Sequence, residues 1–183
     1  MRWITRRNLH IDRTSCPWLI RRFIDPDAAF AFVAPDTDPT TLDGHTFDML
    51  GAEYSHADGH CTFQVLLARH GLTTDPALVE LGRIILDADV PPGRSRRPEA
   101  AGLDALIRGF QLATPDDHEK LRLTAPLYDA LYAYWGVCYG SCRQPQSSVR
   151  RRVRGTRDRR VGALACPART PSSERTSQSL NCP

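Results

Sequence analysis

The stretch EYSHADGHCTF at residues 53–63 places a carboxylate, two imidazoles and a thiol close together. These groups belong to Glu53, His56, His60 and Cys61. Imidazole and thiolate are ligands for zinc and for similar borderline metals. The Asp58-Gly59 pair within the same stretch is instead typical of a tight turn. The stretch therefore predicts either a metal or redox site or a turn that leads into a helix.

A second candidate lies at residues 11–26, which read IDRTSCPWLIRRFIDP and are predicted to contain a helix start at Ser15. The first N–H groups of a helix are unpaired and carry partial positive charge. Such a position shifts Cys16 toward the thiolate and binds an oxyanion, with help from the nearby Arg13. The alternative is structural, because Cys16 is also a small hydrophobe suited to a core and Asp12 can pair with an arginine.

Further carboxylates lie at the expected end of one helix and the expected start of the next. Asp87 and Asp89 belong to the segment ILDADV, where they oppose the helix dipole at a cost of about 0.3–1 kcal/mol each. An arginine one turn earlier, such as Arg83, or a bound cation would offset this cost. Glu99 lies near a helix N-terminus, where a carboxylate is favoured without any function. Together with His56, these carboxylates can also form a histidine-and-carboxylate metal site.

The elements that must position these residues are short strands followed by helices. Strands are expected at 3–8, 28–35 and 46–50, and helices at 15–25, 60–70, 76–89, 99–112 and 115–135. Pro26 is expected to end the first helix, and Asp75 with Pro76 is expected to begin the third. Residues 36–46 and 91–98 are predicted to be loops. The pattern predicts an α+β fold, a mostly helical single domain with a few short strands near the N-terminus.

Composition divides the chain into a body at 1–140 and a tail at 141–183. The tail is rich in Arg, Ser and Pro, lacks apolar periodicity and is predicted to be disordered. An out-of-frame extension of an arginine-codon-rich gene is the alternative explanation for its abrupt start. The tail holds ten Arg against Asp158 and Glu174, whereas the body is net acidic. Nucleic-acid binding is therefore not expected of the body.

Several classes of protein are disfavoured by what the sequence lacks. No apolar run approaches the ~20 residues of a membrane span, and the N-terminus has no secretory h-region, so we expect no membrane insertion and a cytoplasmic location. The six cysteines contain no CxxC pair and are expected to be free thiols. GxSxG, Walker A, dinucleotide-binding and HExxH motifs are absent, so these motifs indicate no cofactor or hydrolase class.

The segments WITRRNLHIDRTSCPWLIRRFIDPDAAFAFV and FDMLGAEYSHADGHCTFQVLLARHGL resemble the chromate-resistance protein family, of the ChrB C-terminal-domain type. Further matching segments are DPALVELGRIILDADV, RPEAAGLDALIRGF and PLYDALYAYW, so the resemblance covers residues 2–135. The family is bacterial and is associated with lower chromate accumulation. In longer members this domain follows an N-terminal region linked to chromate-responsive regulation. The resemblance therefore implies a role in chromate resistance.

The resemblance also sorts the candidate residues. Four of them match recurring family positions: Glu53, His56, Cys61 and Glu99. His60 stands at a variable position, and Leu86 stands where many members carry His before Asp87. The resulting prediction has three groups: ligands of a divalent metal ion at His56, Asp87 and Glu99; an oxyanion site at Arg13 and Cys16; and supporting residues Asp12, Glu53, Cys61 and Asp89.

We therefore predict a bacterial chromate-resistance protein that binds a divalent metal ion or an oxyanion such as chromate and lowers chromate accumulation. Chromate is a tetrahedral dianion, which suits an arginine beside a helix N-terminus. Two alternatives stay open: a chromate-responsive sensor or regulatory module that acts through a partner, and a thiol- or metal-dependent chromate reductase. The sequence leaves open the identity of the metal, whether the protein is an enzyme, and whether it forms a homo-oligomer.

Overall fold

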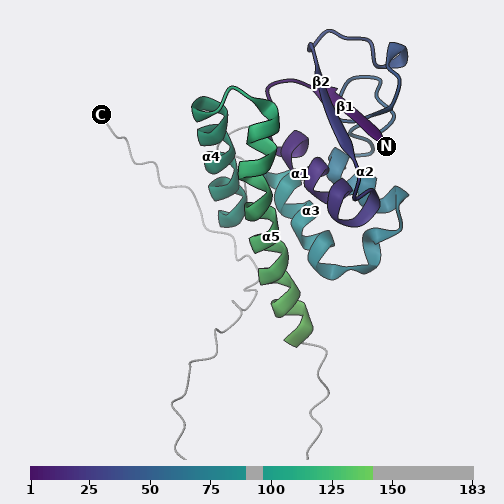
Figure 1. Cartoon of the computed structure of the whole chain (residues 1–183). Coiled ribbons are helices and arrows are strands. Elements are labelled where there is room, and N and C mark those ends of the chain that lie inside the picture. Colours follow the sequence, from purple (N-terminus) through teal and green to yellow (C-terminus); the bar gives the residue numbers. More distant parts are fainter. Residues whose placement is uncertain (90–96, 142–183) are drawn as a thin grey trace, which may run out of the picture. The chain divides into compact units, whose positions relative to one another are not determined.

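The computed structural model of this chain describes residues 1–89 and 97–141 (Figure 1). The expected loop at 91–98 lies outside the described residues except for Arg97 and Pro98. The tail predicted at 141–183 lies outside them from residue 142 onward, so its predicted disorder stays a prediction.

Three short strands near the N-terminus form a parallel sheet. Strand β1 (Arg2–Arg6) lies in the middle and pairs with β2 (Ala29–Val33) on one side and β3 (His45–Thr46) on the other. The strand expected at 46–50 is therefore shorter than predicted and begins one residue earlier. Because the strands run parallel, their carboxyl ends lie at the same edge of the sheet.

Helix α1 (Ile11–Leu19) and a π-helical turn (Ile20–Ile24) connect β1 to β2. The helix begins four residues before Ser15, so the predicted start at Ser15 is wrong. The Ser15 hydroxyl donates to the Asp12 carbonyl oxygen (3.3 Å) inside the helix instead of capping its N-terminus. Asp12 lies in the first turn, where a carboxylate is favoured, and Pro17 lies in the helix interior.

The remaining helices confirm the predictions made from local signals. They are α2 (Thr62–Arg69), α3 (Pro76–Ala88), α4 (Pro98–Ala113) and α5 (Asp117–Ser141), with short 3₁₀ turns at Pro39–Thr41 and Leu72–Thr74. The Asp75 carboxylate accepts hydrogen bonds from the N–H groups of Ala77 (2.9 Å) and Leu78 (3.3 Å), as expected for the cap of α3. Gly71 adopts a left-handed conformation (φ 69°) after α2, which ends that helix.

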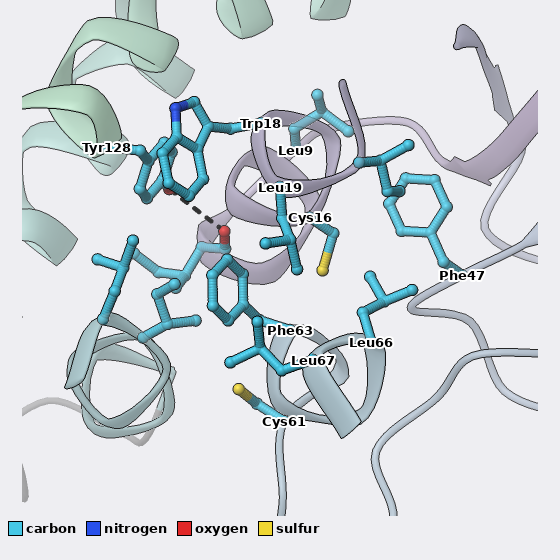
Figure 2. Close-up of a cluster of buried hydrophobic side chains, with 14 of the residues drawn as sticks. Leu9, Cys16, Trp18, Leu19, Phe47, Cys61, Phe63, Leu66, Leu67 and Tyr128 are labelled. Atoms are coloured by element: carbon cyan, nitrogen blue, oxygen red, sulfur yellow. Dashed lines mark hydrogen bonds between the residues drawn. The ribbon is translucent and has the colours of Figure 1, made fainter. Parts of the chain in front are cut away.

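The hydrophobic core lies among the helices and reaches the sheet through Trp3 of β1 and Phe30 of β2. Helix α1 packs against α2, α3 and α5, and α3 also packs against α2, α4 and α5. Their buried side chains form one cluster, which includes both Cys16 and Cys61 (Figure 2). The Thr14 hydroxyl lies 2.6 Å from the Tyr128 hydroxyl and joins α1 to α5 inside this core.

The described residues confirm a mostly helical domain with a few short strands near the N-terminus. The parallel order of the strands was not predicted, and it decides where the candidate site forms. Within residues 1–89 and 97–141, none of the helices is both long and apolar enough to cross a membrane.

Candidate metal centre

His56 lies directly before a two-residue hairpin turn. Asp58 and Gly59 have positive φ angles of 51° and 77°, which the turn expected from this pair requires. The Ala57 N–H donates to the His60 carbonyl oxygen (3.2 Å), and the His60 N–H donates to the Ala57 carbonyl oxygen (2.8 Å). The predicted turn is confirmed, and it restrains the segment that carries His56.

Three carboxylates face the Nε2 atom of His56. Asp12 Oδ2 lies 2.9 Å from this nitrogen, Asp48 Oδ1 lies 3.4 Å from it, and Asp89 Oδ2 lies 3.6 Å from it. One ligand atom from each of Asp12, His56 and Asp89 lies within 4.8 Å of the other two, which is close enough to hold one metal ion. The side chains of His56 and Asp89 are 45% and 30% exposed, so an ion can reach them from solvent.

The parallel sheet explains why residues so distant in sequence meet at this place. The chain leaves the carboxyl end of β1 toward Asp12, and it leaves the carboxyl end of the neighbouring β3 toward Asp48. The connection through α1 leads to β2, on the other side of β1 from β3. In open parallel sheets, such a change in strand order creates a crevice at the carboxyl edge where ligands bind. Asp89 joins the centre as the C-terminal cap of α3.

Asp12 is the most deeply buried of the three carboxylates, with 2% of its side chain exposed. Its Oδ2 atom accepts a hydrogen bond from the Thr62 N–H (2.7 Å), and its Oδ1 atom accepts one from the Phe63 N–H (3.4 Å). These N–H groups belong to the first turn of α2, and their partial positive charge compensates for burial of the carboxylate. Asp12 therefore joins the N-termini of α1 and α2 while it contacts His56.

Asp48 connects the centre to Arg13 and to α2. Its Oδ2 atom accepts a hydrogen bond from Arg13 Nη1 (2.9 Å), and its Oδ1 atom accepts one from the Thr62 hydroxyl (3.1 Å). Burial by itself would raise the pKa of Asp48, but the hydrogen bond from His56 and the charge of Arg13 outweigh burial and lower this pKa. The backbone of Asp48 is left-handed (φ 49°), a conformation that Asp tolerates better than most residues.

The centre favours positive charge. Hydrogen bonds to Asp12 and then to Asp48 raise the pKa of His56 to about 10. Burial, followed by the charges of Asp12 and Asp48, raises the pKa of Asp89 to about 6. The Asp89 carboxylate also lies at the C-terminal end of α3, where the helix dipole disfavours negative charge. A proton on His56 or a bound cation would relieve this excess of negative charge.

The sequence model described as ChrB, C-terminal domain, matches residues 3–135. The chain belongs to the ChrB C-terminal domain family. Protein ChrB from Cupriavidus metallidurans is 38% identical to it over 133 residues. These residues are 73% of this chain and 40% of that protein, so the chain spans less than half the length of its relative. No solved structure matches the chain.

Two predicted metal ligands of this ChrB-family domain, Asp87 and Glu99, are not members of the cluster around His56. The Asp87 carboxylate accepts a hydrogen bond from the Arg97 N–H (2.8 Å). Glu99 lies in the first turn of α4. Neither contributes to the three-residue cluster whose ligand atoms lie within 4.8 Å of one another. The carboxylates in that cluster are two that the sequence assigned a supporting role: Asp12 and Asp89.

Glu53 and Cys61 were also predicted to support the metal site. Glu53 contacts a histidine outside the cluster, whereas the Cys61 thiol lies beside Asp12, and burial, followed by the charge of Asp12, raises the pKa of this thiol. Glu53 Oε2 lies 2.7 Å from His45 Nδ1. The Cys61 N–H donates to Gln64 Oε1 (3.3 Å) at the start of α2, and the Cys61 sulfur lies 4.0 Å from the Gly82 carbonyl oxygen. The two Cys61 contacts stabilise the start of α2 and the packing of α2 on α3.

Arg13 and Cys16, the predicted oxyanion site, differ in their surroundings. Arg13 contacts Asp48, and its Nη2 atom lies 3.5 Å from the Asn8 carbonyl oxygen. Cys16 is fully buried in the interior of α1, and burial, followed by the charge of Asp12, raises the pKa of its thiol well above the usual range. Cys16 does not lie at a helix start, and oxyanion binding at this position stays a prediction.

Two side chains beside the centre were missed by sequence reasoning: His10 and Asp48. His10 Nε2 lies 2.9 Å from Asp104 Oδ1, and His10 Nδ1 lies 4.0 Å from Asp89 Oδ1. Burial lowers the pKa of His10, although the Asp104 charge opposes this effect. The signals that could have indicated these residues are the two-residue spacing of His10 from Asp12 and the place of Asp48 in the family-like segment FDML.

Proposed function

We propose that this domain binds a divalent metal ion between Asp12, His56 and Asp89, and that through this ion it contributes to bacterial chromate resistance. The observation that carries the proposal is the set of three carboxylates around one imidazole nitrogen. Metal–ligand bonds of about 2.0–2.2 Å place neighbouring ligand atoms about 3 Å apart. The separations of 2.9 Å and 3.6 Å from His56 Nε2 are close to this value.

The donor atoms narrow the choice of metal. Imidazole suits Zn, Fe and related ions, whereas carboxylate suits Mn and Mg. One imidazole with two or three carboxylates therefore favours Mn²⁺, Fe²⁺ or Zn²⁺. The link to chromate comes from membership of the ChrB C-terminal domain family.

Charge favours a cation over a free oxyanion at this centre. Three carboxylates are accompanied by Arg13 and, when it is protonated, by His56. A chromate dianion would add negative charge to a site that already has more carboxylates than cations. A bound divalent metal ion neutralises this excess of negative charge and can offer an open coordination position to an oxyanion. We therefore expect chromate or a similar oxyanion to bind only after the metal ion.

A sensor or regulatory role is the second candidate. It is favoured because the three ligands come from three different segments of the chain. Asp12, His56 and Asp89 belong to α1, to a loop and to the end of α3. An ion that binds all three residues would restrain the relative positions of these segments. A partner protein could bind the restrained conformation selectively. Slower hydrogen exchange across the three segments on addition of Mn²⁺ would support this role. Unchanged exchange outside the ligand residues would count against it.

A thiol-dependent chromate reductase receives less support. The reactive form of cysteine is the thiolate, which forms readily in exposed and electropositive surroundings. Cys16 and Cys61 are instead fully buried, and burial raises the pKa of both thiols.

Elemental analysis of purified full-length protein tests metal binding. After incubation with Mn²⁺, Fe²⁺ or Zn²⁺ and removal of free ion, the wild-type protein should retain one of these metals and His56→Ala should lose it. His60→Ala is the matched control, because His60 is an exposed histidine that contacts Gln64 and lies outside the cluster. A wild-type protein that retains no metal, or a His56→Ala variant that retains as much, would overturn the proposal.

The link to resistance is tested in bacteria that lack this gene. Cells that express the wild-type chain should accumulate less chromate than cells with an empty vector, and His56→Ala should lose this effect. His60→Ala should behave as the wild type. If cells with His56→Ala and cells with wild type accumulate equal chromate at equal protein levels, metal binding at His56 is not needed for resistance.

A further inference from the structure

His10 lies between two carboxylates at the edge of the candidate metal centre. Its Nε2 atom lies 2.9 Å from Asp104 Oδ1, and its Nδ1 atom lies 4.0 Å from Asp89 Oδ1. The single Nε–H of Arg108 is shared between the two oxygens of Asp104, with Nε 3.0 Å from Oδ1 and 2.9 Å from Oδ2. A carboxylate that is paired with a guanidinium acts only as an acceptor, so the proton between His10 and Asp104 belongs to His10 Nε2.

This hydrogen bond determines what the other ring nitrogen can do. A neutral imidazole carries one N–H, so with the proton on Nε2 the Nδ1 atom presents a lone pair. The group that Nδ1 faces, Asp89 Oδ1, is also an acceptor. Two lone pairs that face each other attract only when a cation lies between them. Neighbouring ligand atoms on one ion lie about 3 Å apart, but two ligands on opposite sides of the ion, with bonds of about 2.0–2.2 Å, lie about 4 Å apart, which is the separation found here.

Asp89 has both oxygens directed at imidazoles. Its Oδ2 atom faces His56 Nε2 at 3.6 Å, and its Oδ1 atom faces His10 Nδ1 at 4.0 Å. His10 is itself held in place, because it is the N-terminal cap residue of α1 and its carbonyl oxygen accepts from the Thr14 N–H (2.9 Å). A histidine whose second nitrogen is bound by a carboxylate is the usual arrangement of a metal-ligating imidazole.

We propose that His10 is a further metal ligand of this centre through Nδ1, that Asp89 is shared between His10 and His56, and that Asp104 is the positioning residue of His10. This inference rests on the proposed metal binding at His56. It adds a residue outside the three-residue cluster whose ligand atoms lie within 4.8 Å of one another, so His10 and Asp89 must approach the ion when it binds. The donor set then has two imidazoles, one ligating through Nδ1 and the other through Nε2.

Nuclear magnetic resonance of the full-length protein, labelled with ¹⁵N in its histidines and loaded with Zn²⁺, distinguishes the two nitrogens. The wild-type protein should show one histidine bound through Nε2 and one bound through Nδ1. His10→Gln should remove the Nδ1-bound signal and leave the Nε2-bound signal, whereas His56→Gln should remove the Nε2-bound signal. His60→Gln is the matched control and should leave both signals unchanged.

The outcomes separate this inference from the proposed function. An Nε2-bound signal from His56 without any Nδ1-bound signal would overturn the role of His10 and leave the proposed metal site intact. The absence of both signals would overturn the inference, and if elemental analysis also finds no retained Mn²⁺, Fe²⁺ or Zn²⁺, the proposed function is overturned as well. A proton instead of a metal ion between His10 and Asp89 would appear as a doubly protonated His10 ring in the Zn²⁺-loaded protein, and this result also overturns the inference.

Asp104→Ala tests the positioning role. Loss of a carboxylate that orients a metal-bound histidine typically weakens metal affinity about 10–100-fold. We expect a loss in this range for Zn²⁺, together with a shift of the metal-free His10 ring from the Nε2–H form to a mixture of both tautomers. Asp104→Asn retains an oxygen that can accept from His10 Nε2 and should recover part of the affinity. An unchanged tautomer and affinity in Asp104→Ala would overturn the positioning role.

Discussion

The Thr62 N–H donates a hydrogen bond of 2.7 Å to Asp12 Oδ2, the same oxygen that lies 2.9 Å from His56 Nε2. One carboxylate oxygen therefore satisfies the N-terminus of α2 and also belongs to the candidate metal centre. Formation of the fold and formation of the site depend on the same atom. Substitutions at Asp12 consequently change both stability and binding, whereas His56 and Asp89 are the more selective probes of binding.

Asp12→Ala should lower the free energy of unfolding by about 2 kcal/mol or more. The substitution leaves the N–H groups of Thr62 and Phe63 without their acceptor, and an unsatisfied buried N–H costs about 1–3 kcal/mol. Asp12→Asn retains an acceptor oxygen and should be less destabilising. Urea denaturation followed by circular dichroism measures both values, and an Asp12→Ala variant as stable as wild type would contradict the bonds assigned to Asp12.

Asp89→Asn should make the metal-free protein more stable while it weakens metal binding. Burial and the charges of Asp12 and Asp48 raise the pKa of Asp89 to about 6. Near neutral pH the Asp89 carboxylate is therefore ionised although burial and the two neighbouring carboxylates disfavour its charge. The pKa is raised by about two from its usual value of 3.8, and one unit of pKa corresponds to about 1.4 kcal/mol, so removal of the charge should raise the free energy of unfolding by up to about 3 kcal/mol.

Thermal denaturation without metal and calorimetric titration with Mn²⁺ measure the two effects of Asp89→Asn. Asp87→Asn is the matched control, because Asp87 lies two residues earlier and outside the cluster. It should keep the metal affinity of the wild type. If Asp89→Asn binds Mn²⁺ as tightly as wild type, Asp89 is not a ligand.

Stability of the metal-free protein should depend on pH through His56. The folded state raises the pKa of His56 from 6.5 to about 10, so folding favours the protonated ring. The contribution of His56 to stability is therefore complete below about pH 6.5, falls as the pH rises, and is lost above about pH 10. The difference in unfolding free energy between wild type and His56→Gln should shrink across this range. Urea titrations near both limits measure it, and a difference that does not vary with pH would contradict the prediction.

Cys16 and Cys61 should resist alkylation in the native protein. Both side chains are fully buried in the core cluster, and burial is the first cause of the raised pKa of each thiol. Iodoacetamide should label them only after unfolding, whereas the half-buried Cys138 should react in the native state. Mass spectrometry of digested protein assigns the labelled residues. Rapid labelling of Cys16 or Cys61 before unfolding would contradict this prediction and would support the hypothesis of a thiol-dependent reductase.

Local sequence signals predicted the elements that depend on local interactions. Asp75 followed by Pro76 marked the start of α3, and the Asp58-Gly59 pair marked the hairpin turn. The start of α1 was misplaced at Ser15 because a short polar side chain can bond inside a helix as well as cap it, and here its hydroxyl bonds to the Asp12 carbonyl oxygen. The local sequence pattern is compatible with both uses.

By itself, the sequence determined the ChrB family, the mostly helical domain and the importance of His56 as a candidate ligand. Only the tertiary structure decided which carboxylates face His56. The parallel pairing of β1 with β3 brings Asp12 and Asp48 to one edge of the sheet, and the packing of α3 brings Asp89 rather than Asp87 to the same place. Strand order and helix packing depend on contacts between residues far apart in the chain. The spacing of residues within one segment does not indicate those contacts.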